Sequence, residues 1–117
     1  MEFKAYKMDG LGNDFVIIDR RKDDVNLSKE EIIKIGNRNN IGFDQIIFIE
    51  KETKGAFPIT IYNPDGIEVG ACGNGSRCIA FLISKENNQN LIKLSAEKKI
   101  LQAEILIEKI VKINMGF

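Results

Sequence analysis

The sharpest chemical feature of the sequence is the segment Ala71–Cys78 (ACGNGSRC), which carries the thiol of Cys72. The residues from Asn74 onward are apolar nearly all round, which predicts a helix buried on most faces and places Cys72 at its start. Unpaired backbone N–H groups and the positive end of the helix dipole lower the pKa of a thiol from about 8.5 at such a position. The sequence therefore predicts a reactive thiolate.

The residues after Cys72 could also hold an anion. Gly73 and Gly75 carry no side chain that would keep a ligand away from the backbone N–H groups of the helix start. One turn could thus supply both a base and a carboxylate site. Two alternatives remain open at this point. Cys72 could be a small buried hydrophobe beside a glycine-shaped cap, or the loop could bind phosphate, although it lacks the P-loop pattern and its lysine.

The second cysteine is predicted to have a different role. Cys78 is six residues beyond Cys72, which on a helix turns it by about 240°, and it is followed by apolar residues. We therefore expect it to pack in the core. The C-x5-C spacing matches no common zinc pattern, and in a chain without an export signal we expect reduced thiols and no metal. The chain has no histidine, so any proton chemistry must use other groups.

Three side-chain amides lie beside predicted strand ends or tight turns, where they could point into a cleft and bind a zwitterionic amino acid: Asn13, Gln45 and Asn63. Each has a simpler explanation as well. Asn63 could cap a turn, and Gln45 could be a solvated strand residue. The neighbouring Asp14 could form a local Asx-type hydrogen bond. The residue types alone do not decide between these interpretations.

Composition limits the kind of protein. The 117 residues suffice for one domain, and 17 Lys and Arg residues balance 17 Asp and Glu residues. No basic stripe is present, so nucleic acid is not an expected partner. No segment approaches about 18 consecutive apolar residues, and the amino terminus does not resemble a signal peptide. We expect a cytoplasmic protein that does not bind or cross a membrane.

The pattern along the chain predicts one small mixed domain. Ser28 and Glu31 form a capping box, with Leu27 able to contact Ile32, which predicts a helix over about 29–38. A second helix follows Cys72 and extends to about Ser84. Apolar and β-branched runs predict strands around a turn at 10–12 and a second turn at 63–66. The expected strands are 2–8, 15–18, 44–50, 58–62, 67–69, 91–94, 99–107 and 110–115.

Many strands with one amphipathic and one buried helix indicate an α+β domain. We expect a curved, mostly antiparallel β-sheet wrapped around the second helix.

Four motifs taken in order resemble the diaminopimelate epimerase family. The similarity spans essentially the whole chain, because Asn114-Met115-Gly116 resembles the segment that closes the first domain of that family. The four motifs are Gly10-Leu11-Gly12-Asn13-Asp14-Phe15, Ile41-Gly42-Phe43-Asp44-Gln45, Tyr62-Asn63-Pro64-Asp65-Gly66 and Ala71-Cys72-Gly73-Asn74-Gly75-Ser76-Arg77-Cys78.

The resemblance implies a domain architecture and a chemistry. Two similar domains of β-structure around a central helix clamp the substrate, and each gives one catalytic cysteine; no cofactor is used. Residues 1–117 would be the amino-terminal domain, Cys72 its catalytic thiol, and the carboxy-terminal domain a required partner. The implied substrate is diaminopimelate, contacted by Asn13, Gln45 and Asn63, with the N–H groups of Gly73 and Asn74 holding its α-carboxylate.

Two other functions remain as hypotheses. The chain could be half of a related isomerase, similar to proline racemase or to a phenazine-synthesis enzyme, although the pairing of the first and fourth motifs disfavours this. It could also be a truncated, non-enzymatic domain whose exposed half-cleft allows association into a homo-oligomer, because loss of a partner domain exposes apolar surface. Activity alone, activity with a second half, or no activity would separate these possibilities.

Overall fold

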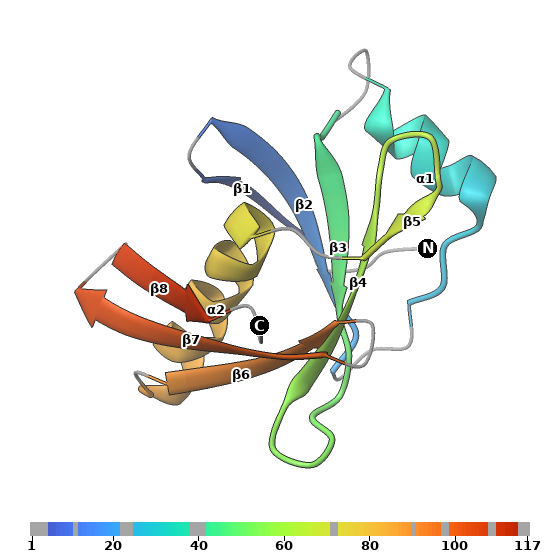
Figure 1. Ribbon diagram of the computed structural model, residues 1–117. Coiled ribbons are helices and arrows are strands. Elements are labelled where there is room, and N and C mark those ends of the chain that lie inside the picture. Colours follow the sequence, from blue (N-terminus) through green and yellow to red (C-terminus); the bar gives the residue numbers. More distant parts are fainter. Residues whose placement is uncertain are drawn as a thin grey trace.

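The computed structural model describes residues 5–10, 12–21, 25–37, 42–70, 73–89, 91–96, 99–107 and 110–114, and these form one mixed sheet with two helices (Figure 1). Their order along the chain is β1 (Ala5–Gly10), β2 (Asn13–Asp19), α1 (Lys29–Gly36), β3 (Gln45–Ile49), β4 (Phe57–Tyr62), β5 (Glu68–Val69), α2 (Gly73–Asn87), β6 (Leu91–Ala96), β7 (Lys99–Ile107) and β8 (Ile110–Asn114).

The predicted elements are confirmed, with ends shifted by a few residues. Strands β1 and β2 form the expected hairpin, in which Gly10 pairs with Asn13. Helix α2 begins one residue earlier than Asn74 and runs on to Asn87. The α+β class and a mostly antiparallel sheet are also confirmed. Residues 2–4, 38 and 115 of the predicted elements lie outside the described residues.

The sheet divides at β4. The strand order is β1-β2-β3-β4-β6-β7-β8, with parallel pairing only between β2 and β3 and between β4 and β6 among the described strands. One edge of β4 is shared by two neighbours. Phe57 and Pro58 pair with β6, whereas Ile61 and Tyr62 pair with β5. The arm made of β1–β3 and the arm made of β6–β8 therefore leave β4 in different directions.

Helix α2 lies between the two arms (Figure 1). It contacts β1, β2 and β3 on one side and β6, β7 and β8 on the other. Its residues Ile79, Ala80 and Ile83 are fully buried in a core that includes side chains from both arms, such as Ile47 and Leu94. Cys78 belongs to the same core and is 7% exposed, which confirms its predicted packing role.

A second, smaller core lies on the other face of the first arm. Phe15 and Ile17 of β2 face α2, whereas Val16 and Ile18 pack in the cluster that includes Ile32 of α1. Successive residues of a strand point to opposite faces. A strand that is covered on both faces therefore needs apolar residues at successive positions, as β2 has from Phe15 to Ile18.

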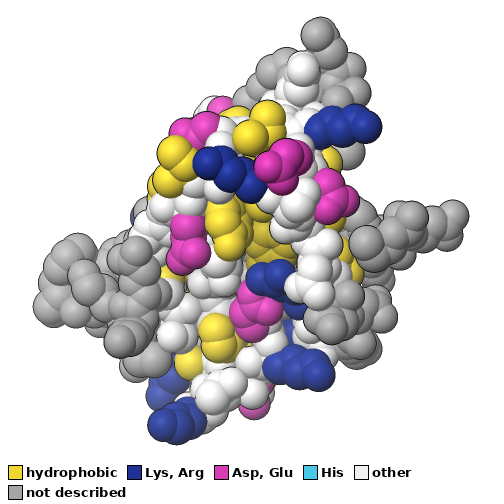
Figure 2. Space-filling model, turned by 90° about the vertical axis from the view of Figure 1, so that its right-hand side faces the viewer, with side chains coloured by type: hydrophobic (Ala, Val, Ile, Leu, Met, Phe, Trp, Pro, Cys, Tyr) yellow, Lys and Arg dark blue, Asp and Glu magenta, His cyan; other side chains and the backbone are white. Residues whose placement is uncertain are grey.

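The predicted capping box fixes the start of α1. The backbone N–H of Glu31 donates to Ser28 Oγ over 3.1 Å, and the backbone N–H of Ser28 donates to Glu31 Oε1 over 2.9 Å. Leu27 packs against the cluster that contains Ile32, as expected from the sequence. On the α1 side of the molecule, Lys and Arg side chains are interspersed with Asp and Glu side chains (Figure 2). Neither helix in the described part of the chain is long and apolar enough to span a bilayer.

Candidate active site

The three predicted amides gather at one end of the sheet. Asn13 begins β2 and Gln45 begins β3, and the parallel register sets Phe15 beside Gln45. Asn63 directly follows β4, which runs antiparallel to β3 with Tyr62 opposite Ile46. The first residues of two strands and the residue after a third therefore share one sheet end. This arrangement follows from strand direction, which the sequence pattern does not reveal.

Gln45 and Asn63 contact each other directly. Gln45 Nε2 donates to Asn63 Oδ1 over 3.4 Å, and both side chains are half-buried. The backbone of Asn63 closes the predicted turn, since Gly66 N donates to Asn63 O over 2.9 Å and Asn63 N donates to Ile67 O over 3.0 Å. The turn interpretation and the cleft interpretation of Asn63 are therefore compatible: its backbone holds the turn while its side chain faces Gln45.

Asn13 is held by a carboxylate that the sequence reasoning did not assign. Asn13 Nδ2 donates to Asp44 Oδ2 over 3.3 Å, and the same oxygen accepts the backbone N–H of Asp14 over 2.9 Å. In return, Asp44 N donates to Asp14 Oδ1 over 2.9 Å. Lys7 forms an ion pair with Asp14 Oδ2 over 3.0 Å and also donates to the carbonyl of Gly42. Asp14 thus makes long-range contacts with Asp44 and Lys7, beyond the local Asx-type bond considered from the sequence.

The start of α2 supplies the second part of the candidate site. Gly73 and Asn74 are the first two residues of the helix, and N–H groups in a first helical turn have no acceptor within the helix. This confirms the predicted helix start directly after Cys72, but Cys72 itself lies outside the described residues. Ser76, in the same turn, is fully buried, and its Oγ has no hydrogen-bond partner in the described structure.

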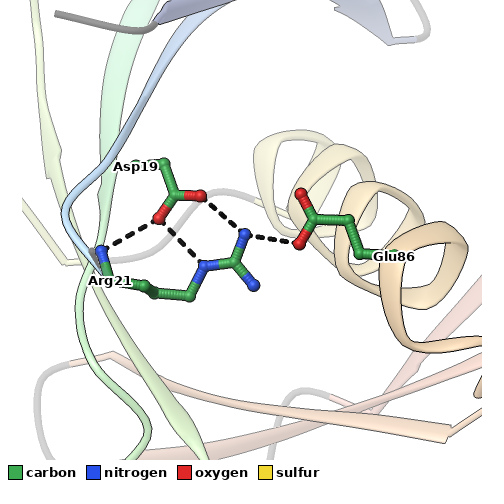
Figure 3. Close-up of polar contacts among 3 residues, drawn as sticks. All are labelled: Asp19, Arg21 and Glu86. Carbon is green, nitrogen blue, oxygen red and sulfur yellow. Dashed lines mark hydrogen bonds and ion pairs between the residues drawn. The ribbon is translucent and has the colours of Figure 1, made fainter. Parts of the chain in front are cut away.

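An arginine clamp fixes the position of α2 along the sheet. Arg21 follows β2 and donates to both oxygens of Asp19, through Nε over 2.9 Å and Nη2 over 2.6 Å; Nη2 also donates to Glu86 Oε2 of α2 over 2.7 Å (Figure 3). The pKa of Arg21 is raised above its usual range. The main cause is the hydrogen bond to Asp19, and the hydrogen bond to Glu86 adds to it, whereas burial acts in the opposite direction and lowers the pKa. The clamp therefore remains charged.

The clamp joins two elements of similar length. Strand β2 and helix α2 run in the same direction in Figure 1, from the β1 side toward β6. Strand β2 has 7 residues and α2 has 15, so each spans roughly 20 Å at ~3.3 and 1.5 Å per residue. Arg21 joins the carboxyl ends of the two elements, whose axes are inclined to each other in Figure 1. Helix α2 contacts both strands of the β1–β2 hairpin, and in Figure 1 its first turn is drawn on the side of the molecule where that hairpin turns.

The other end of the same strands is an ion-pair site rather than a reactive one. A shallow surface depression there is lined by Arg20, Glu50 and Lys51, among others. Arg20 pairs with Glu50, donates to the carbonyl of Val25 over 3.2 Å and stacks on the ring of Phe48 with 4.1 Å between guanidinium carbon and ring centroid. These contacts occupy both terminal nitrogens of the guanidinium, so this depression offers little for a ligand.

Comparison with known proteins identifies a family for nearly the whole chain. The family model described as diaminopimelate epimerase matches residues 5–117. Diaminopimelate epimerase of Pelagibacter ubique is 48% identical over 116 residues, which are 99% of this chain and 42% of that protein. Diaminopimelate epimerase of Legionella pneumophila is 41% identical over 121 residues, with 99% and 44% covered. The chain therefore spans less than half the length of the curated relatives that it matches.

Solved structures share the fold at low sequence identity. Methylitaconate-delta-isomerase matches 92% of this chain and 35% of its own with a TM-score of 0.67 at 14% identity. A PhzF-family phenazine biosynthesis protein from Enterococcus faecalis matches 86% and 39% with a TM-score of 0.65 at 16% identity. A predicted epimerase from Pseudomonas aeruginosa gives a TM-score of 0.65 over 88% of this chain and 39% of its own, also at 16% identity.

Proposed function

Because the chain belongs to the diaminopimelate epimerase family, we propose that it is the amino-terminal half of a cofactor-independent epimerase that interconverts LL- and meso-diaminopimelate in the cytoplasm. Residues 1–117 form one domain of a two-domain enzyme, and the carboxy-terminal domain is its required partner. The observation that carries the proposal is the family match over residues 5–117, which includes all four motifs.

The chemistry requires two proton-transfer groups. To invert an α-carbon without a cofactor, one group removes the proton from one face while another delivers a proton to the opposite face. Cys72 supplies one of these groups as a thiolate at a helix start. Cys78 does not supply the other, because it is buried in the core and only 7% exposed. The second thiol belongs to the carboxy-terminal domain, so residues 1–117 without that domain do not turn over substrate.

The site residues divide the work of binding. The first-turn N–H groups of Gly73 and Asn74 hold the α-carboxylate beside the thiol. Asn13, Gln45 and Asn63 contact the polar groups of the substrate from the sheet end. Support comes from the Gln45–Asn63 contact and from the packing of α2 against β1 and β2. In this proposal the curved sheet wraps around α2 as the central helix of the domain, as the contacts of α2 with both arms suggest.

The direct test is exchange of the α-proton of diaminopimelate in D2O. We would compare this chain alone, the chain mixed with the carboxy-terminal part of the Pelagibacter ubique enzyme, and a fusion of the two. That enzyme, split at the same position, serves as the positive control. We expect exchange only in the mixture or the fusion, and its loss by a factor of at least about 1,000 in Cys72→Ala, because a general acid–base group contributes 10²–10⁴-fold and no second group replaces it.

Cys78→Ala is the matched control, since it removes the other thiol of the chain from the core. It should keep exchange within a few-fold of the unchanged mixture. No exchange in the fusion, while the split control is active and the chain is folded, would refute the proposal and favour a non-enzymatic domain. Exchange of proline but not of diaminopimelate in the fusion would instead favour a related isomerase. Size measurement of the chain alone, with and without the second half, separates self-association from pairing with that half.

A further inference from the structure

The amide of Asn13 has a fixed orientation because its neighbour is a carboxylate. An ionised carboxylate accepts hydrogen bonds and donates none, so the Nδ2 group of Asn13 must face Asp44. The observed contact is Nδ2 to Asp44 Oδ2 over 3.3 Å. The carbonyl Oδ1 of Asn13 is therefore turned away from Asp44. The contact with Asp44 thus selects one of the two orientations that a side-chain amide can adopt.

Asp44 is itself held in place by β2, which is paired with β1 on its far side. Its Oδ2 accepts the backbone N–H of Asp14 and its own N–H donates to Asp14 Oδ1, both over 2.9 Å. Lys7 of β1 pairs with the remaining oxygen of Asp14 over 3.0 Å. Three chain segments thus converge on one carboxylate pair. A group held by several bonds can impose an orientation on a neighbour that has fewer constraints.

We propose that Asp44 is a positioning residue that orients the Asn13 amide so that its carbonyl oxygen accepts a hydrogen bond from an ammonium group of the substrate. This inference rests on the proposed function, in which Asn13 contacts an amino acid substrate. Asp44 does not touch the substrate; it acts through Asn13. An ammonium donates three hydrogen bonds and accepts none, so an amide presenting its N–H2 group instead would repel it.

The first arm of the test uses the chain alone and does not depend on the proposed function. The side-chain amide of Asn13 is assigned by its disappearance from the 15N NMR spectrum of Asn13→Ala. We expect one of its two protons to resonate downfield because of the bond to Asp44, and to move toward the value of a solvated amide in Asp44→Ala. Asp44→Asn keeps an oxygen acceptor of the same size, so the shift should largely remain. An Asn13 signal unchanged in Asp44→Ala would overturn the proposal.

The second arm measures epimerisation in the fusion described above. We expect Asp44→Ala to raise KM about tenfold with kcat within about twofold, because one hydrogen bond to a charged group is lost from binding. Asp44→Asn should stay within about threefold of the unchanged fusion. Glu50→Gln is the matched control: Glu50 follows β3 as Asp44 precedes it, and it contacts Arg20 at the far end of the sheet. Its kinetic constants should not change.

A double variant separates positioning from a general structural role. If Asp44 acts only through Asn13, then Asn13→Ala combined with Asp44→Ala should have the same KM as Asn13→Ala alone, within about twofold. A further tenfold loss in the double variant would show that Asp44 acts by another route and would overturn the proposal. A fusion with no exchange at all refutes the proposed function, and the NMR arm then still decides whether Asp44 orients Asn13.

Discussion

The two cysteines are expected to differ in role, because Cys78 lies inside α2 and Cys72 precedes the first residue of α2 in the sequence. Cys78 is inside α2, among Ile79 and Ile83, where burial in apolar surroundings makes a thiol inert. Cys72 directly precedes the helix, where N–H groups and the helix dipole favour a thiolate. The sequence already predicts this difference, because Cys78 is six positions beyond Cys72 and a helical period would turn the two positions about 240° apart.

Two glycines with the same backbone conformation provide a test at the residue scale. Gly66 and Gly55 both have φ of +80°, so an added Cβ strains the backbone equally. A Cβ at Gly55 meets nothing within 4 Å, whereas at Gly66 it would lie 2.6 Å from Lys29 Cγ and 3.3 Å from Lys29 O. We expect Gly55→Ala to lower the free energy of unfolding by about 1 kcal/mol and Gly66→Ala by about 2–3 kcal/mol, measured by urea denaturation.

Lys29→Ala gives the control for this comparison. It removes the side-chain atoms that a Cβ at Gly66 would meet first, so it should recover part of the loss in Gly66→Ala and none of the loss in Gly55→Ala. Equal losses in the two glycine variants would mean that the turn after β4 moves away from α1 at no cost. The close approach seen between Gly66 and Lys29 would then have no role in stability.

The candidate site shows which residues a sequence can reveal. Asn13, Gln45 and Asn63 were candidates because they lie beside strand ends and turns, but only the family resemblance singled them out as substrate contacts. Asp44 was not a candidate, since its role depends on the parallel pairing of β2 with β3, which brings together residues 31 positions apart. An aspartate before a strand is common in loops, and only the register assigns it a partner.

Among the helices and strands, α1 has a start that can be recognised from a few neighbouring residues of the sequence. The Ser28–Glu31 pair forms two reciprocal hydrogen bonds within four residues of chain, so no long-range contact is needed to recognise it. The clamp of Arg21 with Asp19 and Glu86 is the opposite case. It joins β2 to a helix 65 residues away, and nothing in the spacing of these charges predicts it.

The capping box predicts a pH dependence of stability. In the folded chain the pKa of Glu31 is lower than its ordinary value of 4.5. The main cause is the hydrogen bond from the backbone N–H of Ser28, and the Ser28 hydroxyl adds to it. A carboxyl whose folded pKa is depressed stabilises the fold above its unfolded pKa, and this contribution disappears as the pH falls through the folded value. Urea denaturation of the unchanged chain and of Glu31→Gln across this range should therefore give a difference in free energy that shrinks below pH 4.5.

The glutamine variant is a fair comparison because glutamine also completes a capping box but does not titrate. Ser28→Ala, which removes the hydroxyl acceptor, should lower the free energy of unfolding by about 1 kcal/mol near neutral pH. A constant difference between the unchanged chain and Glu31→Gln down to the lowest pH at which both fold would contradict the assignment. The capping carboxylate would then contribute no pH-dependent stability.

The arrangement of the strands in the whole molecule cannot be inferred from the individual strands and helices. Strands and helices were predictable from period and composition, but the division of the sheet at β4 depends on two parallel pairings between distant segments. Helix α2 closes the space between the arms, and its buried face contacts both. One helix therefore carries the core of the domain and, at its first turn, the candidate anion site. Stability and function are coupled through its position.

This coupling predicts that the two arms unfold together. Ile83 is fully buried in the core between the arms, whereas Ile33 on α1 is 43% exposed. We expect Ile83→Ala to lower the free energy of unfolding by about 2–5 kcal/mol and Ile33→Ala by less than about 1 kcal/mol. Hydrogen exchange followed by NMR should show amides of β3 and of β6 losing the same protection in Ile83→Ala, because removing the shared side chain weakens both arms at once. If only β6 lost protection, the arm of β6–β8 would unfold as a separate unit, and Ile83 of α2 would stabilise that arm alone.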